Sequence, residues 1–342
     1  MTNFAVDFKN KIREMKKLGF LVRFMKDWTL PIAMVAGVAC YFVYTGFDFV
    51  EPLKPAVHEV LAFLTPFLIF AQLLLTFSKI KVRELSPRMW NVWLLLIQFV
   101  TFMAVALVLI FVPMSNWLRI FGEGVMVCLI CPTATAAAII TGKLGGSAAS
   151  LTTYTLLSNV LAAVFVPLMF PLVESSDMRF VEAFLKILSK VFPLLICPFL
   201  LAVVIRNWFP AIQRFLLSLK DLAFYLWAVA LTIVMAQTTK SMLSGETSVV
   251  EEVIVALGAL IACCLQFYYG KKIGGIYDDR ISGGQALGQK NTVLAIWMAC
   301  TYLHPSSAIA PGSYVIWQNI INSWQLWKKR VRATARVAPA LN

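Results

Sequence analysis

Ten apolar runs of about 20 residues fill most of this 342-residue sequence. About 20 consecutive apolar residues are what a helix needs to cross the hydrocarbon core of a bilayer. Because the runs leave no stretch that could fold as a separate soluble domain, they predict an all-α, polytopic membrane protein. The expected spans are residues 28–46, 56–77, 89–112, 119–142, 147–173, 180–205, 215–237, 249–270, 282–302 and 305–327.

The distribution of basic residues predicts on which side of the membrane each segment between the spans lies. Lys and Arg number 30 against 17 Asp and Glu, a formal net charge of +13, and on a soluble chain this excess would indicate a nucleic-acid partner. In membrane proteins, Lys and Arg collect in cytoplasmic loops. With the N-terminus inside, 22 basic residues fall in inside segments and four in outside ones. The charge pattern therefore predicts a multi-pass protein of the inner (plasma) membrane with both termini cytoplasmic, and no nucleic-acid partner.

The chain is expected to form three parts. Residues 1–27 have apolar side chains every three or four positions, with the basic side chains largely elsewhere. This pattern is typical of an amphipathic helix lying on the inner leaflet; a helix that binds a partner is the alternative. Residues 28–327 form a single transmembrane domain, and residues 328–342 form a basic cytoplasmic tail.

Neither the cysteines nor any common catalytic motif in the sequence indicates an enzymatic reaction or a metal site. The seven cysteines all fall inside predicted spans, and an odd, buried set does not indicate a disulfide framework. Cys128 and Cys131 form a C-x-x-C, but no second pair or nearby histidine completes a tetrahedral zinc site. We interpret them as packing residues, with metal or redox chemistry as the alternative. The sequence also has no nucleophile elbow and no phosphate-binding loop, so we expect no enzyme, cofactor or metal.

Two spans are interrupted by residues that do not suit a lipid-facing helix. Pro132 breaks the fourth span, and Gly288 lies in the ninth span just before Gln289, Lys290 and Asn291. The two breaks are 156 residues apart, close to half the chain, so they occupy matching positions in two halves of five spans. When the repeated unit has an odd number of spans, its second copy enters the membrane from the side opposite to the first. Paired broken helices in such an inverted repeat indicate the binding site of a secondary transporter; two kinks with packing roles are the alternative.

Two ionisable groups outside the breaks have structural interpretations. Glu123 follows Arg119 by four residues, a spacing that predicts an ion pair on one helix face. His304 precedes Pro305 at a predicted outer turn and is expected to cap or to lie in the loop.

Four polar segments within the spans share their residue types with a known class of transporters. They are C-P-T-A-T-A-A-A from Cys131 to Ala138, A-L-G-Q-K-N from Ala286 to Asn291, Gln98 in the third span, and Ser150, Thr152, Thr153 and Thr155 in the fifth. With these residues, the sequence resembles the bile acid:sodium symporter family, whose members have ten helices, two of them unwound and crossing. The resemblance implies a panel (28–77 and 180–237) and a core (89–173 and 249–327) that moves against it.

The departures from the family pattern concern sodium. The positions that ligate sodium in coupled members are here Ala137, Ala138, Ala286 and Lys290. Because a hard cation needs several oxygen ligands, these residues argue against sodium coupling through the family's usual two sites. A Lys290 ammonium near Gln98 would supply the missing positive charge covalently, and beside the N-termini of the broken helices it would favour an anionic substrate group. A snorkelling or structural lysine is the alternative.

The sequence thus predicts a secondary active transporter that moves a small organic anion, bile-acid-like or a carboxylate, by alternating access in the bilayer. The alternatives are a metalloid (arsenite-type) or auxin-type sodium-independent exporter and, in another class, a non-transporting membrane receptor or scaffold. The residues expected to contact the substrate or its path are Lys290, Gln289, Asn291, Gln98, Thr133, Thr135, Ser150, Thr152 and Thr153, with helix breaks at Pro132 and Gly288.

Overall fold

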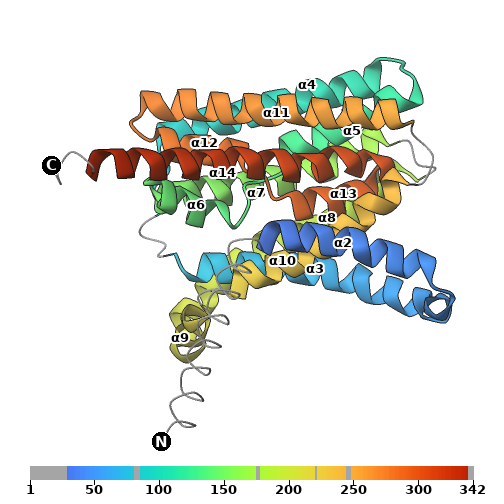
Figure 1. Cartoon of the computed structure of the whole chain (residues 1–342), viewed down its shortest axis with the longest axis horizontal. Helices are drawn as coiled ribbons and strands as arrows, with labels where there is room; N and C mark the ends of the chain where they lie inside the picture. Colours follow the sequence, from blue (N-terminus) through green and yellow to red (C-terminus); the bar gives the residue numbers. More distant parts are fainter. Residues whose placement is uncertain (1–28, 81–84, 175–177, 220–221, 244–247, 338–342) are drawn as a thin grey trace, which may run out of the picture.

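The computed structural model describes residues 29–80, 85–174, 178–219, 222–243 and 248–337. The predicted amphipathic helix over 1–27 and the last residues of the predicted tail lie outside them. The described residues form an all-helical protein with thirteen α-helices and two short 3-10 helices (Figure 1). In chain order these are α2 (Thr29–Gly46), η1 (Asp48–Leu53), α3 (Lys54–Ser78), α4 (Met89–Phe111), α5 (Asn116–Ile130), α6 (Ala137–Leu144), α7 (Ala148–Val173), α8 (Phe180–Trp208), α9 (Pro210–Ser218), α10 (Leu222–Met242), α11 (Val249–Ile276), α12 (Arg280–Gly288), α13 (Thr292–Tyr302), η3 (Pro305–Ala308) and α14 (Ile309–Val337).

Five helical segments are long and apolar enough to cross a membrane, which makes this a multi-pass membrane protein. They are Val50–Ser78, Met89–Phe111, Ala148–Val173, Phe180–Trp208 and Val249–Ile276. On α4, for example, Val92, Leu96, Val100, Leu107 and Phe111 are between 43% and 76% exposed. A row of exposed aliphatic and aromatic side chains along one helix is unfavourable in water and favourable against lipid.

The structure differs from the predicted span over 215–237. Residues 210–218 form the separate helix α9, which buries no residue, and the long helix α10 begins only at Leu222. Pro210 occupies the first position of α9, where its fixed φ and missing N–H are tolerated. Since α9 ends at Ser218, residues 215–218 belong to α9 and not to the long helix. At the other end of the chain, α14 continues to Val337, so residues 328–337 of the predicted tail are helical.

The helices form two groups that share one apolar core. In the first group, α10 packs on α2 and α3, and α3 packs on α8. In the second, α11 packs on α12 and α14 while α4 packs on α5 and α7, and α8 also packs on α7. Figure 1 shows α2, α3 and α10 lying along one side of the second group. The core that joins them contains Leu73, Phe102, Val166, Leu231 and Met298, all with no exposed surface. Each comes from a different helix, so the predicted panel and core regions are in direct apolar contact.

Glycine allows α12 to lie directly against α11. A Cβ built on Gly270 would come within 2.4 Å of the carbonyl oxygen of Gly283, and one on Gly283 within 2.8 Å of the Cα of Gly274. Small residues at such an interface let two helix backbones approach closely, which is how helices in membranes gain packing energy without a hydrophobic driving force. This contact places α12, and the residues that follow it, at a fixed depth beside α11.

Candidate functional site

The two interrupted helices cross at their breaks. The chain leaves α5 after Ile130 and α12 after Gly288, and the extended segments that follow pair in an isolated antiparallel bridge between Thr133 and Lys290. The backbone N–H of Ala134 donates to the carbonyl of Gln289 over 2.9 Å, and that of Asn291 donates to the carbonyl of Pro132 over 2.8 Å. Non-helical backbone at membrane depth needs such partners, and here each break supplies them to the other.

The carbonyl groups at the end of α5 are bonded by two side chains that sequence analysis singled out. The Nζ atom of Lys290, a residue only 1% exposed, donates to the Leu129 carbonyl over 3.2 Å. The Nε2 atom of Gln98 donates to the carbonyls of Ile130 and Cys131 over 2.8 and 3.3 Å. The last carbonyls of a helix lack intrahelical donors and carry negative partial charge. The ammonium therefore lies at a helix C-terminus, whereas the sequence interpretation placed it beside helix N-termini.

Three other predicted residues complete the crossing. The Oγ1 atom of Thr133 donates to the Ala286 carbonyl over 2.6 Å, and the Oδ1 atom of Asn291 accepts from the backbone of Leu294 over 3.3 Å, which caps α13. Gln289 is 3% exposed, and its Oε1 atom has no hydrogen-bond partner within the part of the chain that the structure describes. The crossing thus brings together Thr133, Gln98, Gln289, Lys290 and Asn291.

Helix α14 contributes a polar row that sequence analysis missed. The Tyr314 hydroxyl donates to the Gly288 carbonyl over 2.8 Å, and Gln318 accepts from the Lys290 backbone over 2.9 Å and donates back to its carbonyl over 3.3 Å. One turn further, Asn322 accepts from Gln285 over 2.9 Å. Positions 314, 318 and 322 are four residues apart and face the same side of a helix. That four-residue spacing of Tyr314, Gln318 and Asn322 was the available signal in the sequence.

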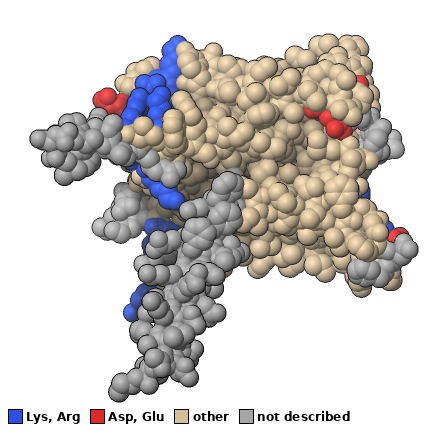
Figure 2. All heavy atoms as spheres, viewed as in Figure 1, with Lys and Arg blue, Asp and Glu red and all other residues tan. Residues whose placement is uncertain are grey.

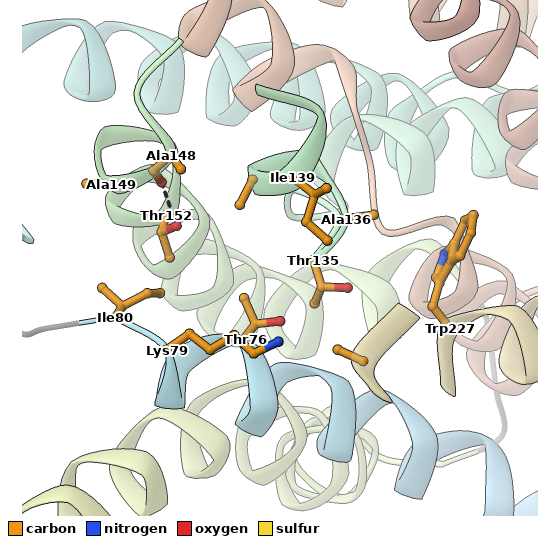
Figure 3. Close-up of a pocket in the computed structure, with 12 residues that line it drawn as sticks. Thr76, Lys79, Ile80, Thr135, Ala136, Ile139, Ala148, Ala149, Thr152 and Trp227 are labelled. Atoms are coloured by element: carbon orange, nitrogen blue, oxygen red, sulfur yellow. Dashed lines mark hydrogen bonds between the residues drawn. The ribbon is translucent and has the colours of Figure 1, made fainter. Parts of the chain in front are cut away.

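Thr135 and Thr152 lie in a cavity of about 240 Å³ between the two groups of helices. Its walls come from the ends of α3 and α10 on one side and from α6 and α7 on the other, and Figure 3 shows Thr76, Lys79 and Trp227 among the lining side chains. In the sequence, Lys79 falls between the predicted spans 56–77 and 89–112, and Trp227 falls inside the predicted span 215–237. Neither has a local signal, because only the packing of distant helices brings them to the same cavity.

Ser150 and Thr153 lie outside both the crossing and the lining of the cavity. The Ser150 hydroxyl donates to the carboxylate of Asp279 over 2.6 Å, and Asp279 also pairs with Arg88 at 3.3 Å. This cluster joins the start of α7 to the turn between α11 and α12. The Thr153 hydroxyl donates to the Ala149 carbonyl of its own helix over 3.2 Å, a local bond that helical threonines commonly make.

Glu123 and His304 have the structural roles that the sequence predicted. The Arg119–Glu123 ion pair is present at 3.5 Å. The side chain of His304 caps η3 by accepting from the Ser306 backbone over 3.3 Å, so both predictions are confirmed. The fully buried Glu123 also accepts from the backbone N–H of His304 over 3.2 Å, which ties α5 to the turn before η3.

Three of the cysteines, Cys128, Cys131 and Cys263, are buried, whereas Cys40 and Cys264 are exposed. All seven carry free thiols, and the Sγ atom of Cys131 donates to the Asn291 carbonyl over 2.9 Å. Cys128 lies within electrostatic range of the Lys290 ammonium, as does Cys131. Among the described residues, no three His, Cys, Asp or Glu side chains are grouped so that they could hold a metal ion.

The sequence profile of the SBF-like CPA transporter family matches residues 50–326. The matched region runs from η1 into α14 and includes both interrupted helices. This family is related to the bile acid:sodium symporters, so the resemblance inferred from the polar segments is confirmed at that level. A comparison with curated proteins gave no match.

Proposed function

We propose a transport mechanism for this chain, which belongs to the SBF-like CPA transporter family. Membership indicates a secondary transporter that is embedded in the membrane and is not an enzyme. The proposal is that the protein moves a small organic anion, a carboxylate or a bile-acid-like compound, by alternating access. We place it in the inner (plasma) membrane with both termini cytoplasmic, on the distribution of Lys and Arg in the sequence.

The transport unit we propose has ten spans in an inverted repeat of five and five. The helices of the two halves correspond in sequence order. The first half consists of α2, α3, α4, the broken pair α5 and α6, and α7. The second half consists of α8, α10, α11, the broken pair α12 and α13, and α14. In this scheme the two interrupted helices are the fourth member of each half. Their breaks meet in antiparallel orientation at Thr133 and Lys290. An antiparallel meeting is what a two-fold axis in the plane of the membrane would produce.

The cavity of about 240 Å³ is our candidate for the substrate's path. It lies between α3 and α10 on one side and α6 and α7 on the other, so a molecule held there would contact both groups of helices. A relative movement of the groups would therefore change which side of the membrane the cavity opens to. Thr76, Thr135, Thr152 and Lys79 line the cavity. The hydroxyls of Thr76 and Thr152 donate to carbonyls of their own helices over 2.8 and 2.7 Å, so the groups that suit a carboxylate are the Thr135 hydroxyl and the Lys79 ammonium.

Our proposal that transport does not use the family's usual sodium sites rests on Lys290. Its ammonium is buried at the end of α5 and bonds to the Leu129 carbonyl. Among the described residues it forms no ion pair with an acidic side chain. A buried ammonium at the negative end of a helix provides the charge that a bound cation would otherwise bring. Ala137, Ala138 and Ala286 offer no side-chain oxygen to a cation at the neighbouring positions.

The test is uptake into proteoliposomes. A thermal-shift screen of organic anions, with arsenite as one arm, selects the substrate, and uptake is then measured in sodium and after replacement of sodium by choline or potassium. Uptake should persist in all three salts. Loss of uptake in choline and potassium would refute the tethered-cation proposal, and absence of flux for every ligand that binds would favour the receptor or scaffold alternative.

A variant pair sharpens this test. Lys290→Gln should abolish or strongly reduce uptake because it removes the buried charge, and the combination Lys290→Gln with Ala286→Glu should restore uptake that depends on sodium. The matched control is Lys186→Gln, which removes a lysine from an exposed position on α8 and should leave uptake in all salts unchanged. Equal losses in the control would show that the effect at 290 is not specific.

A further inference from the structure

A second, shallower pocket lies where α11 ends and turns into α12. Its volume is about 420 Å³, and it is lined by Tyr268, Lys271, Lys272, Gly275, Ile276 and Arg280. Figure 2 shows Lys and Arg side chains gathered on the side of the molecule where, in Figure 1, α12 and the C-terminal end of α14 lie. The pocket is on the surface, separate from the crossing of the broken helices and from the cavity between the helix groups.

The pocket has an excess of positive charge. Its lining contains three cations, and Lys271 also interacts electrostatically with Lys328 of α14. Within the described part of the chain none of the three is in an ion pair. The nearby carboxylate of Asp279 is bonded instead to Arg88 and Ser150. Cations brought together without a protein counter-ion favour an anionic ligand.

Contacts with neighbouring groups position two of these cations. The stem of Lys271 lies over Gly284, where an added Cβ would come within 2.5 Å of its Cγ, and its Nζ atom is 5.9 Å from the ring centroid of Phe267. The Nζ atom of Lys272 is 6.0 Å from the ring centroid of Tyr268. Cation–π contacts at such distances restrain an ammonium without neutralising it, so both charges stay available to a ligand.

The surface of α11 leading to the pocket is apolar along one face. The exposed side chains recur every three or four positions, and they are Val250, Ile254, Leu257, Ile261, Leu265 and Tyr268. At 1.5 Å per residue this row is about 27 Å long, close to the roughly 30 Å of the hydrocarbon core. Lys272 follows one turn after Tyr268. The cations of the pocket therefore lie where the acyl chains end and the headgroups begin.

We propose that this pocket binds the phosphate of an anionic phospholipid, whose acyl chains lie along the apolar row of α11. Basic pockets at the edge of the hydrocarbon core bind acidic headgroups, and the row below the pocket distinguishes a lipid from a soluble anion. The bound lipid would hold the turn between α11 and α12 in place. Because α12 leads directly to Lys290, the lipid would stabilise the element that carries the crossing.

The test is the melting temperature of the purified full chain in a neutral detergent. Phosphatidylglycerol, phosphatidylcholine and inorganic phosphate are added in separate titrations. Phosphatidylglycerol should raise the melting temperature in a saturable way, and the other two should not at equal concentration. A shift of the same size with inorganic phosphate would show a site for free anions and overturn the lipid proposal, and equal shifts with both phospholipids would overturn the role of the charge.

Variants test whether the shift in melting temperature comes from lipid bound at this pocket. The triple change Lys271→Gln, Lys272→Gln and Arg280→Gln should raise the phosphatidylglycerol concentration that gives half of the full melting-temperature shift. The increase should be on the order of 100-fold, because each of the three cations contributes about fivefold. The charge-preserving triple Lys271→Arg, Lys272→Arg and Arg280→Lys should stay close to wild type. If the neutral triple does not fold, Lys272→Gln alone should give about a fivefold change, because its side chain is exposed.

The matched control removes three exposed cations from other places, with Lys143→Gln, Arg214→Gln and Arg332→Gln. It should change the half-shift concentration by less than about threefold, because scattered surface charges contribute little. An equal loss in this control, no loss in the neutral triple, or a loss in the charge-preserving triple would each overturn the proposal.

Discussion

Replacement of Gln98 by leucine tests whether the side-chain amide of Gln98 stabilises the break after α5 by donating hydrogen bonds to the carbonyl groups that the break leaves without a helical donor. The Gln98 amide donates to Ile130 and Cys131 over 2.8 and 3.3 Å, and its Oε1 atom accepts from the Tyr154 hydroxyl over 2.7 Å. Gln98 is 1% exposed, and the other three residues have no exposed surface. Water cannot reach these groups when the amide is lost.

The expected magnitude follows from the groups left without a partner. A buried polar group that loses its hydrogen bond costs about 1–3 kcal/mol. Gln98→Leu strands the Tyr154 hydroxyl and the Ile130 carbonyl, and the longer bond to Cys131 contributes less. Since leucine keeps most of the apolar volume, the cavity contribution is small. The free energy of unfolding should fall by about 2–4 kcal/mol. Tyr154→Phe strands only the Gln98 oxygen, so it should cost about 1–2 kcal/mol.

The measurement is denaturation of the purified protein in detergent micelles, followed by tryptophan fluorescence. The matched control is Thr101→Val, three residues further along α4, where an exposed hydroxyl bonds only within its own helix at 2.7 and 3.2 Å. A double-mutant cycle between Gln98 and Tyr154 should give a coupling of about 0.6–1.7 kcal/mol. If Gln98→Leu and Thr101→Val differ by less than about 0.5 kcal/mol, which is the usual effect of a surface change, our account of the break is refuted.

Three further predictions concern the crossing and the cavity. Gly288→Ala should destabilise the protein by about 1–3 kcal/mol, because the added Cβ would lie within 2.4 Å of the Phe267 ring; a melting temperature equal to wild type would contradict this contact. Tyr314→Phe, which removes the hydroxyl bonded to the Gly288 carbonyl, should cost about 1–2 kcal/mol in the same denaturation assay. Ala149→Phe places a ring in the cavity of about 240 Å³ and should reduce uptake at least about tenfold, equivalent to about 1.4 kcal/mol of binding, with little change in melting temperature. Ala104→Phe, at an exposed position of α4, is its control, and equal losses of uptake would remove the cavity from the pathway.

The sequence located the helices and their interruptions because both have local causes. Apolar runs predicted α3, α4, α7 and α8 to within three residues at each end, and α11 except for its last six residues, since the length of such a run is set by the thickness of the bilayer. At the first interruption, Pro132 removes a backbone donor. At the second, the missing side chain of Gly288 leaves room for the Phe267 ring, which an added Cβ would approach within 2.4 Å. The main local error was the span over 215–237, which runs across the end of α9 at Ser218 and the start of α10 at Leu222.

The sequence also supplied the candidate residues of the crossing but not their partners. It named Lys290 and Gln98 as residues that need an explanation at membrane depth. It did not show that their donors reach the carbonyls of Leu129, Ile130 and Cys131. Lys290 and Leu129 are 161 residues apart, and no local pattern encodes a contact at that separation.

By itself, then, the sequence determined an all-helical membrane protein with two broken helices and an unusual buried lysine. Only the tertiary structure decided where that lysine points, which helix supplies Gln318 as a partner, and that Lys79 and Trp227 line a cavity with Thr135. The physical reason is that helix formation and helix breaking depend on neighbouring residues, whereas the bonding of buried polar groups depends on which helices pack together. Such packing is decided by the fit of whole helix surfaces.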